Sequence, residues 1–175
     1  MKITHDMHTH TTYSHGNNSI AKMVAKARKL GLTAITISDH GRSHPVFGVR
    51  KGNFAKMRAE IDALNQKYTD IEIYLSVESN IIGANGDIDI KAEEKKYCDW
   101  ICAGYHYGYF PASLKDIFVF AIPNYAARLL PFMGNDQQDV AGATLVYRVG
   151  GFVVVGHTAT IAAATYSNGN TFTAA

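Results

Sequence analysis

Histidines gather near the start of the chain, at a spacing that suits metal binding. His8 and His10 follow a short apolar, strand-like segment, and His15 stands five residues further on. Because alternate residues of a strand share a face, the first two imidazoles should point the same way. Two imidazoles on one face at the end of a strand can bind one metal ion, and His15 can reach a neighbouring ion from the following loop. The pattern predicts a site that holds more than one ion.

Three more candidate ligands follow segments that are apolar, β-branched and short, as buried strands are. Parallel strands place their C-terminal ends at one rim of an α/β barrel, and such folds keep their chemistry at that rim. Ligands at four successive strand ends are much harder to attribute to chance than a ligand at one. The predicted strands, each with the residue near its end, are 2–8 with His8, 33–38 with His40, 71–77 with Glu78 and 100–105 with His106.

Clustered divalent ions of this kind suit the hydrolysis of a phosphate ester. They lower the pKa of bound water from about 16 to about 7, and they clamp the attacking and leaving oxygens of an in-line displacement. A glutamate such as Glu78 can bridge two ions, because each of its oxygens can bind a different one. Imidazole and carboxylate suit zinc, manganese or iron, so the ligand types alone do not choose the metal.

Two amphipathic helices must position these strands. Apolar residues recur at helical spacing over 17–31, where Asn18 or Ser19 can cap the helix and Gly31 can end it. A second helix follows Asn53, which is its predicted cap. The apolar face of this second helix consists of Phe54, Met57, Ile61 and Leu64.

A turn signal and a short helix complete the regular part of the pattern. The pair Asn85–Gly86 predicts a small β-hairpin over 79–90, in which Asp87 and Asp89 face solvent. A short helix follows over 91–97. The repeated order of strand, loop and helix predicts an α/β fold with a mainly parallel sheet.

The sequence after the fourth strand is less regular. Residues 109–133 are aromatic and apolar but are broken by prolines and charges, so they predict a packed core helix or a mobile lid and not a membrane span. Residues 152–155 form a fifth predicted strand, which ends at His157. The tail 158–175 carries no charge, and eleven of its residues are Ala or Thr. We therefore predict one domain over 1–157 and a low-complexity tail.

Composition sets bounds on the class of protein. At 175 residues and 47% hydrophobic, the chain has enough apolar material for one globular domain. The formal net charge of +2 is too small to argue for a nucleic-acid or membrane partner. Cys98 and Cys102 lack the spacing and the second pair of a zinc ribbon, so we expect reduced thiols in a cytoplasmic protein. The chain begins directly with the histidine cluster, and no signal peptide is expected.

In order and spacing these residues resemble the PHP (polymerase and histidinol phosphatase) family, and most closely its small stand-alone bacterial phosphoesterases. The resemblance covers residues 3–108. A later motif, Gly156–His157, resembles a family strand end that proline usually follows, where this chain has Thr158. The motifs that carry the resemblance are His8-Thr9-His10, His15, Ser38-Asp39-His40-Gly41, Glu78 and Gly104-Tyr105-His106.

The resemblance implies a distorted (β/α)7-type barrel with up to three divalent metal ions, which are zinc, manganese or iron. It also implies that Glu78 bridges the first and second ions. The implied ligands are His8, His10 and Glu78 for the first ion, Glu78, His106 and His157 for the second, and His15 and His40 for the third.

The chain departs from the family after His157. The family closes its barrel with two further strands, the last ending in Asp-x-His, and no aspartate or histidine follows His157 here. We predict about five βα units where the family has seven, and so an incomplete barrel. The chain is then expected to be truncated, to carry a tail that is not natural sequence, or to need a partner. An open sheet edge would favour aggregation, so we expect a homo-oligomer that covers it.

We assign Asp39, His40 and Glu78 as the catalytic residues, acting on a small phosphorylated metabolite through a metal-activated hydroxide. Asp6 and Asp39 adjoin ligands in sequence, and we predict that they orient imidazoles by accepting the second ring N–H. The cations that could hold the substrate phosphate are Arg42, which we choose, Arg50 and Lys51.

Three other functions remain open. A nuclease acting on DNA 3′ ends would suit the polymerase-linked members of the family, but the chain lacks polymerase sequence and a basic groove, so no nucleic-acid partner is expected. An inactive metal-binding remnant would account for the absent closing ligands. An amidohydrolase-type enzyme also opens with His-x-His but expects a metal-bridging lysine where Glu78 stands. Of the other histidines, His5 is predicted to be structural and His44 is unassigned.

Overall fold

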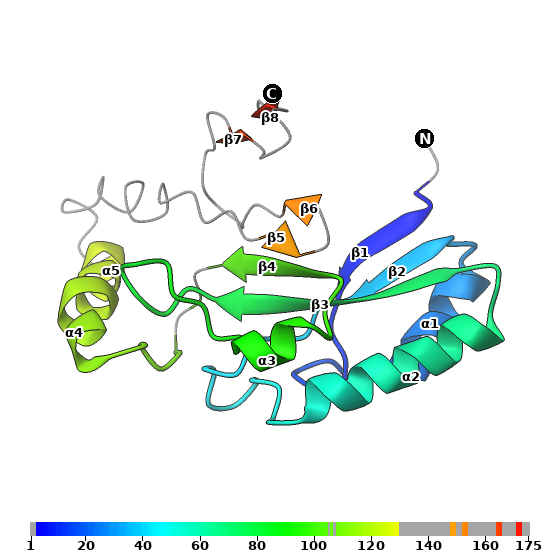
Figure 1. Cartoon of the computed structure of the whole chain (residues 1–175), viewed down its shortest axis with the longest axis horizontal. Helices are drawn as coiled ribbons and strands as arrows, with labels where there is room; N and C mark the ends of the chain where they lie inside the picture. The colour runs from blue at the N-terminus through cyan, green and yellow to red at the C-terminus, as the bar shows by residue number, and fades with distance from the viewer. Residues whose placement is uncertain are drawn as a thin grey trace.

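Four parallel strands form the centre of the structure (Figure 1). The computed structural model describes residues 3–104, 106 and 108–129, together with four two-residue strands between 148 and 172. The sheet follows the order of the chain, β1-β2-β3-β4, and each neighbouring pair is parallel. The strands are β1 (His5–Thr9), β2 (Ala34–Ile37), β3 (Glu72–Asn80) and β4 (Trp100–Gly104).

Helices connect the successive strands and lie along one face of the sheet (Figure 1). They are α1 (Ile20–Lys29), α2 (Asn53–Lys67) and α3 (Ala92–Lys95). A parallel sheet in chain order, with its crossovers on one face, curls as the wall of an α/β barrel does. The α/β class and the parallel sheet are therefore confirmed, as a curled half-barrel. The complete (β/α)7 barrel and the five βα units stay predictions.

The core lies between the sheet and the first two helices. Side chains alternate along β3, so Ile73, Leu75 and Val77 are buried toward the helices and Glu78 lies on the opposite face. Burying an aliphatic or aromatic side chain of this size stabilises the fold by about 1.5–3 kcal/mol. The apolar faces predicted for the two helices are confirmed, because they are buried in the structure. The buried residues are Ile20, Val24 and Ala27 on α1 and Phe54, Met57 and Ile61 on α2.

The capping predictions are partly right. Ser19 caps α1, since its hydroxyl accepts a hydrogen bond from the backbone N–H of Lys22, and Gly31 follows the helix with a φ of 73°. The prediction that Asn53 caps α2 is wrong. Gly52 is the N-cap, with a φ of 80° that glycine adopts without the Cβ clash of other residues, so the helix begins at Asn53 itself.

The third strand runs beyond the predicted 71–77, so Glu78 lies inside it. Pairing with β4 continues as far as Asn80 and lengthens the strand. Main-chain bonds also tie Glu78 to the end of β2. Its N–H donates to the carbonyl of Asp39 at 3.0 Å, and its carbonyl accepts from the N–H of Gly41 at 2.8 Å. The backbone of Glu78 is therefore fixed between two neighbouring strands.

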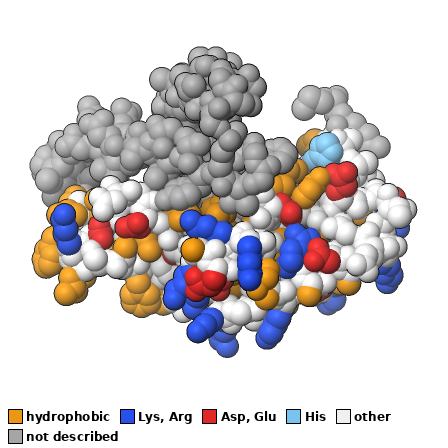
Figure 2. All heavy atoms as spheres, viewed as in Figure 1, with side chains coloured by type: hydrophobic (Ala, Val, Ile, Leu, Met, Phe, Trp, Pro, Cys, Tyr) orange, Lys and Arg blue, Asp and Glu red, His pale blue; other side chains and the backbone are white. Residues whose placement is uncertain are grey.

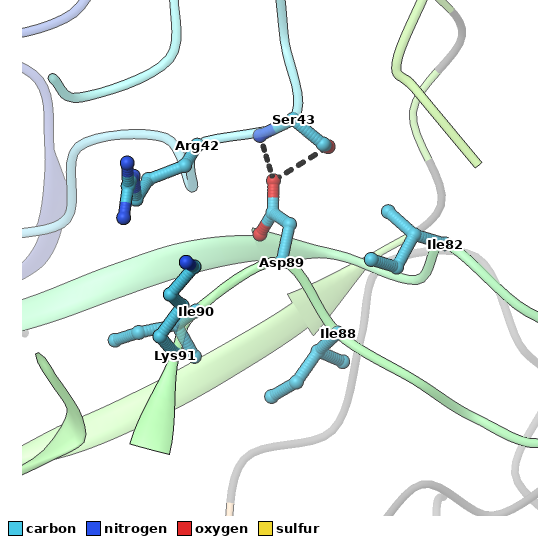
Figure 3. Close-up of a pocket in the computed structure, with 7 residues that line it drawn as sticks. All are labelled: Arg42, Ser43, Ile82, Ile88, Asp89, Ile90 and Lys91. Atoms are coloured by element: carbon cyan, nitrogen blue, oxygen red, sulfur yellow. Dashed lines mark hydrogen bonds between the residues drawn. The ribbon is translucent and has the colours of Figure 1, made fainter. Parts of the chain in front are cut away.

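The predicted hairpin follows β3, with an antiparallel bridge between its arms and a φ of 83° at Gly86. Asp87 is exposed, as predicted. The prediction that Asp89 faces solvent is wrong, because this residue is only 7% exposed. Its carboxylate accepts hydrogen bonds from the backbone N–H and the hydroxyl of Ser43, at 2.9 and 2.7 Å (Figure 3). Donors from the distant loop after β2 thus compensate for its burial.

The apolar segment after β4 is helical and has one buried face. It comprises α4 (Leu114–Asp116), the π-helical turn η1 (Ile117–Ala121) and α5 (Ile122–Leu129). Pro123 lacks the N–H that would bond one turn back, which accounts for the widened turn before it. Phe120 is buried, whereas Phe118 and Val119 are exposed, so the predicted packed helix holds for one face. Among the described residues, no helix combines the length and hydropathy needed to cross a membrane.

Beyond α5 the described strands form two antiparallel pairs. They are β5 (Arg148–Val149) with β6 (Phe152–Val153), and β7 (Ala164–Thr165) with β8 (Thr171–Phe172). Over its described residues, Phe152 and Val153, the predicted fifth strand pairs with β5. Only Gly150 and Gly151 separate β5 from β6, a spacing typical of a tight hairpin. His157 lies outside the described residues, and the domain boundary beside it stays a prediction.

Charges of both signs are mixed on the face shown in Figure 2, where Lys and Arg side chains are interspersed with Asp and Glu. Several of the described cations are paired. Arg28 lies 2.9 Å from Asp70, and Arg58 lies 2.8 Å from Asp62. Over the described residues, this face therefore has no continuous basic surface.

Candidate metal centre

The predicted ligands converge at the C-terminal end of the parallel strands. They form three overlapping groups, and within each group the ligand atoms all lie within 4.8 Å of one another. The groups are His10, His15 and His40; His8, His10 and Glu78; and His40, Glu78 and His106. Every predicted ligand among the described residues belongs to at least one group, although metal binding by each remains a prediction.

Glu78 lies at the centre of these groups. Its Oε2 is 3.3 Å from Nε2 of both His8 and His10, and 3.4 Å from Nδ1 of His40. Its Oε1 is 3.0 Å from Nε2 of His106. Each carboxylate oxygen thus faces its own imidazoles, which is the arrangement that a bridging carboxylate needs.

These contacts shift the pKa values of Glu78 and His8. Burial would raise the pKa of Glu78, but hydrogen bonds from His10, His106 and His8 outweigh it and hold that pKa well below its usual range. Contacts with the Cys102 thiol and with Glu78 raise the pKa of His8 to about 10. A metal ion at Glu78 would therefore compete with a proton on His8.

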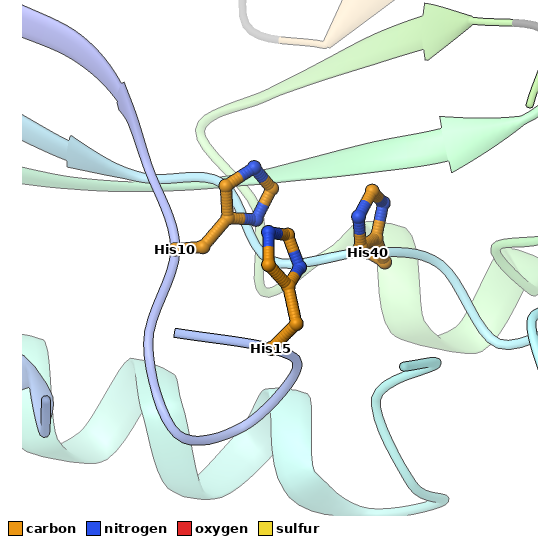
Figure 4. A group of neighbouring side chains, drawn as sticks. All are labelled: His10, His15 and His40. Carbon is orange, nitrogen blue, oxygen red and sulfur yellow. The ribbon is translucent and has the colours of Figure 1, made fainter. Parts of the chain in front are cut away.

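His10, His15 and His40 bring three rings together from the end of β1, the following loop and the end of β2 (Figure 4). The ring centroids of His10 and His15 are 4.4 Å apart, and each lies 4.9 Å from the ring of His40. Burial lowers the pKa of His15, and it lowers the pKa of His40 to about 4. At neutral pH these two rings are uncharged, which is the form that binds a metal ion.

The donor set fits a divalent cation. The Nδ1 atoms of His10 and His40 are buried, and neither has a hydrogen-bond partner among the described residues. A buried polar atom without a partner costs about 1–3 kcal/mol. A cation among these rings would satisfy such atoms, and imidazole with carboxylate is a donor set for zinc, manganese or iron.

Asp39 shapes the loop that carries His15. It is fully buried, and its carboxylate accepts from the N–H of Thr11 at 2.7 Å and from the hydroxyls of Thr11 and Ser14 at 2.5 Å. The nearest imidazole atom, Nδ1 of His10, is 3.9 Å away, too far for a hydrogen bond. Asp39 therefore positions the loop backbone and does not accept a ring N–H as predicted.

Two other residues with predicted roles, Asp6 and Arg42, contact other parts of the protein. The exposed Asp6 accepts from the backbone N–H of His8 at 3.4 Å and does not hold a ring. Arg42 lies 3.3 Å from Glu94 and lines a pocket of about 290 Å³ at the hairpin (Figure 3). A role for Arg42 in substrate binding therefore stays a prediction. The alternative cations of the same loop, Arg50 and Lys51, are exposed.

The remaining described histidines lie outside the three groups. His5 is exposed on β1, in the edge strand of the described sheet. His44 shapes its own loop, because its Nδ1 accepts hydrogen bonds from the backbone N–H groups of Val46 and Phe47 at 3.3 and 3.0 Å.

Sequence reasoning missed two neighbours of the site. Cys102 lies opposite Glu78 in the pairing of β3 with β4, and it contacts His8. Asn80 contacts Nδ1 of His106 at 2.8 Å through its side-chain oxygen. The alternation of β3 could have found Asn80, because residues two apart in a strand share a face.

Acid should destabilise the metal-free protein between pH 6.5 and about 4. The pKa of His40 falls from 6.5 to about 4 on folding, so through this window the unfolded chain binds a proton that the folded chain does not. Stability from His40 is therefore lost as the pH falls. The lowered pKa of Glu78 acts in the same direction below its ordinary 4.5. The raised pKa of His8 acts oppositely, because its contribution is complete below pH 6.5 and is lost as the pH rises through about 10.

Urea unfolding midpoints in the presence of a chelator, at several pH values from 7 to 4, measure this effect. His40→Asn should flatten the decline between pH 6.5 and 4. A decline of the same size in wild type and H40N would contradict the assignment of this window to His40.

Comparison with known proteins places the chain in a family. The sequence model of the PHP domain matches residues 6–162. The chain belongs to the PHP domain family. The PHP match extends past the resemblance over 3–108 and takes in His157.

The chain is similar to several proteins that are named probable phosphatases. It is 30% identical over 125 residues to one from Vibrio parahaemolyticus, covering 71% of this chain and 48% of that protein. It is 27% identical over 153 residues to one from Clostridium acetobutylicum, covering 82% and 54%. It is 31% identical over 103 residues to one from Caldicellulosiruptor bescii, covering 58% and 40%. This PHP chain thus spans about half the length of these relatives.

Proposed function

We propose that this PHP chain hydrolyses a phosphate ester of a small metabolite, with up to three divalent ions bound around Glu78. One observation carries the proposal: the Glu78 carboxylate lies among four imidazoles that come from three separate segments of the chain. The names of the curated relatives support the reaction class. Zinc, manganese or iron would suit the donors.

The three overlapping groups together would hold up to three ions. Bound ions would supply a nucleophile from water and would offset the negative charge on the phosphoryl oxygens. The proposed ligands are His8, His10 and Glu78 for the first ion, Glu78 and His106 for the second, with His157 as predicted from the family, and His15 and His40 for the third.

The three residues assigned as catalytic would have different roles. Glu78 and His40 would hold ions directly, and Asp39 would act through the loop that it fixes. Arg42 would bind the substrate phosphate. To do so, its guanidinium must either break its ion pair with Glu94 or contact Glu94 and the phosphate together. An arginine can bind two phosphate oxygens at once, which suits this task.

Release of inorganic phosphate tests the proposal. The full chain is freed of metal with a chelator, reloaded with zinc, manganese or iron(II), and offered a panel of nucleoside and sugar monophosphates. We expect turnover only after reloading, because water bound to a divalent ion is the nucleophile. Single-stranded DNA is the matched comparison substrate.

Two of the alternative functions, the nuclease and the inactive metal-binding member, have their own outcomes in this assay. Cleavage of DNA without release of phosphate from any monoester would favour the nuclease. Metal binding without turnover of either substrate would favour an inactive metal-binding member of the family. Both outcomes contradict the proposed phosphoesterase.

We also propose that a second copy of the chain covers the open edge of the sheet, and that the protein is cytoplasmic. β1 is the edge of the described four-stranded sheet, and its residues from His5 to His8 are exposed. An exposed strand edge favours pairing with another chain. The free state of Cys98 and Cys102 is compatible with a reducing compartment. A monomer in sedimentation at high protein concentration would contradict the proposed oligomer.

A further inference from the structure

A buried polar pair lies behind His106, and the metal groups do not include it. Asn80 is the last residue of β3 and is fully buried, and Asp89 comes from the second arm of the hairpin and is 7% exposed. Burying these groups would be costly without hydrogen bonds. The contacts that they make, and the direction of each, determine how His106 is held.

Asp89 accepts five hydrogen bonds. Its Oδ1 accepts from the Ser79 hydroxyl at 2.6 Å and from the Asn80 backbone N–H at 2.9 Å. Its Oδ2 accepts from the Ser43 N–H and hydroxyl and from Nδ2 of Asn80, the last at 2.7 Å. Gly41 leaves room for this carboxylate, because a Cβ at Gly41 would overlap it. The carboxylate acts only as an acceptor.

The carboxylate fixes which way the amide of Asn80 faces. Only the NH₂ end of an amide can donate to a carboxylate, so Nδ2 must face Asp89. The same Nδ2 lies 3.2 Å from the hydroxyl oxygen of Ser43, which can accept from it. The amide oxygen of Asn80 must then point the other way, toward His106.

The direction of the amide in turn selects the tautomer of His106. The amide oxygen of Asn80 is 2.8 Å from Nδ1 of His106, and an amide oxygen can only accept. Nδ1 must therefore carry a hydrogen, which leaves Nε2 as the ring nitrogen that can give its lone pair to a metal ion. That Nε2 lies 3.0 Å from Oε1 of Glu78, and a cation shared by the two would replace any hydrogen held between them.

We propose that Asp89 and Asn80 are a positioning pair that selects the His106 tautomer whose Nε2 is free to bind a metal ion. Metal-binding histidines commonly donate their other ring N–H to a fixed acceptor, which orients the ring. His10 and His40 differ, since the buried Nδ1 of each has no hydrogen-bond partner among the described residues. The metal-binding part of this inference rests on the proposed function, and the tautomer does not.

Nitrogen-15 NMR of the metal-free full chain reads the tautomer directly. Long-range ¹H–¹⁵N spectra at pH 8.5, with the His106 signals assigned by their loss in H106N, should show a proton on Nδ1 in the wild type. Asn80→Ala removes the acceptor, and His106 should shift toward the Nε2–H form that free histidine prefers in water. Asp89→Asn removes the constraint on the amide and should give a mixture of the two forms.

The same variants should bind zinc more weakly, by about 10–100-fold, as expected for loss of a partner behind a ligand. The control is Asn85→Ala, which changes an exposed asparagine of the same hairpin and should alter neither the tautomer nor the affinity. A purely structural role would lower stability without moving the His106 signals.

The wild-type spectrum alone can overturn the proposal, if it shows no proton on Nδ1 of His106. An unchanged tautomer in folded N80A or D89N would overturn it as well. Should N80A fail to fold, D89N, which keeps the shape of the side chain, decides the matter. A tautomer that shifts as expected in a protein that hydrolyses no phosphate ester would support the positioning pair while the proposed function fails.

Discussion

Replacing Glu78 with glutamine should abolish binding at two of the three metal groups and lower phosphate-ester hydrolysis by about 1,000-fold or more. Glu78 belongs to both of those groups, and each of its oxygens faces different imidazoles. Glutamine keeps the shape but removes the negative charge and one acceptor oxygen. Losing about 4 kcal/mol of charge stabilisation in the transition state corresponds to three factors of ten in rate.

Metal content per chain and the rate of phosphate release from a metal-loaded sample measure this effect. The matched control is Glu93→Gln, an exposed glutamate of α3 outside the three metal groups. E93Q should match the wild type in both measurements. If E78Q keeps its ions and its rate, Glu78 is not the shared ligand.

Replacing Asp39 with asparagine should cost about 3 kcal/mol of stability and remove the ion of the His10, His15 and His40 group. The fully buried carboxylate accepts three hydrogen bonds from the loop residues Thr11 and Ser14, and hydrogen bonds to a charged group contribute about 1.5–3 kcal/mol each. Asparagine replaces one carboxylate oxygen with an NH₂ group, which cannot accept a hydrogen bond from these donors. The loop should then release His15, while the Glu78 groups keep their ions.

Urea denaturation of the metal-free chain and the metal content of the loaded chain test this prediction together. Asp87→Asn is the control, because Asp87 is an exposed aspartate of the hairpin. Loss of all ions in a folded D39N would show that the groups do not bind independently. Full stability with an unchanged metal content would show that Asp39 does not hold the loop.

Local patterns in the sequence were enough to predict the α/β class, the mainly parallel sheet and the meeting of its ligands. Strand segments are short and β-branched, and helix faces repeat at regular spacing, so each element can be located without knowing its neighbours. The parallel order then brings His8, His40 and Glu78 to one rim. Family resemblance added the pairing of ligands with ions, which spacing alone does not provide.

Errors arose where distant partners decide the structure. Asp89 looks like a solvent-facing hairpin residue, but donors from Ser43 and Ser79 make its burial favourable. Asp39 adjoins a ligand in sequence, yet its carboxylate accepts a hydrogen bond from the backbone N–H of Thr11 in the loop after β1.

Anomalous diffraction at the zinc absorption edge, from crystals of the full chain grown with zinc, tests the central claim most directly. The claim is that imidazoles from separate segments share cations through Glu78. We predict one peak within bonding distance of each Glu78 oxygen, one beside His8 and His10 and the other beside His106. Zinc bound elsewhere, with no peak at either oxygen of Glu78, would contradict it.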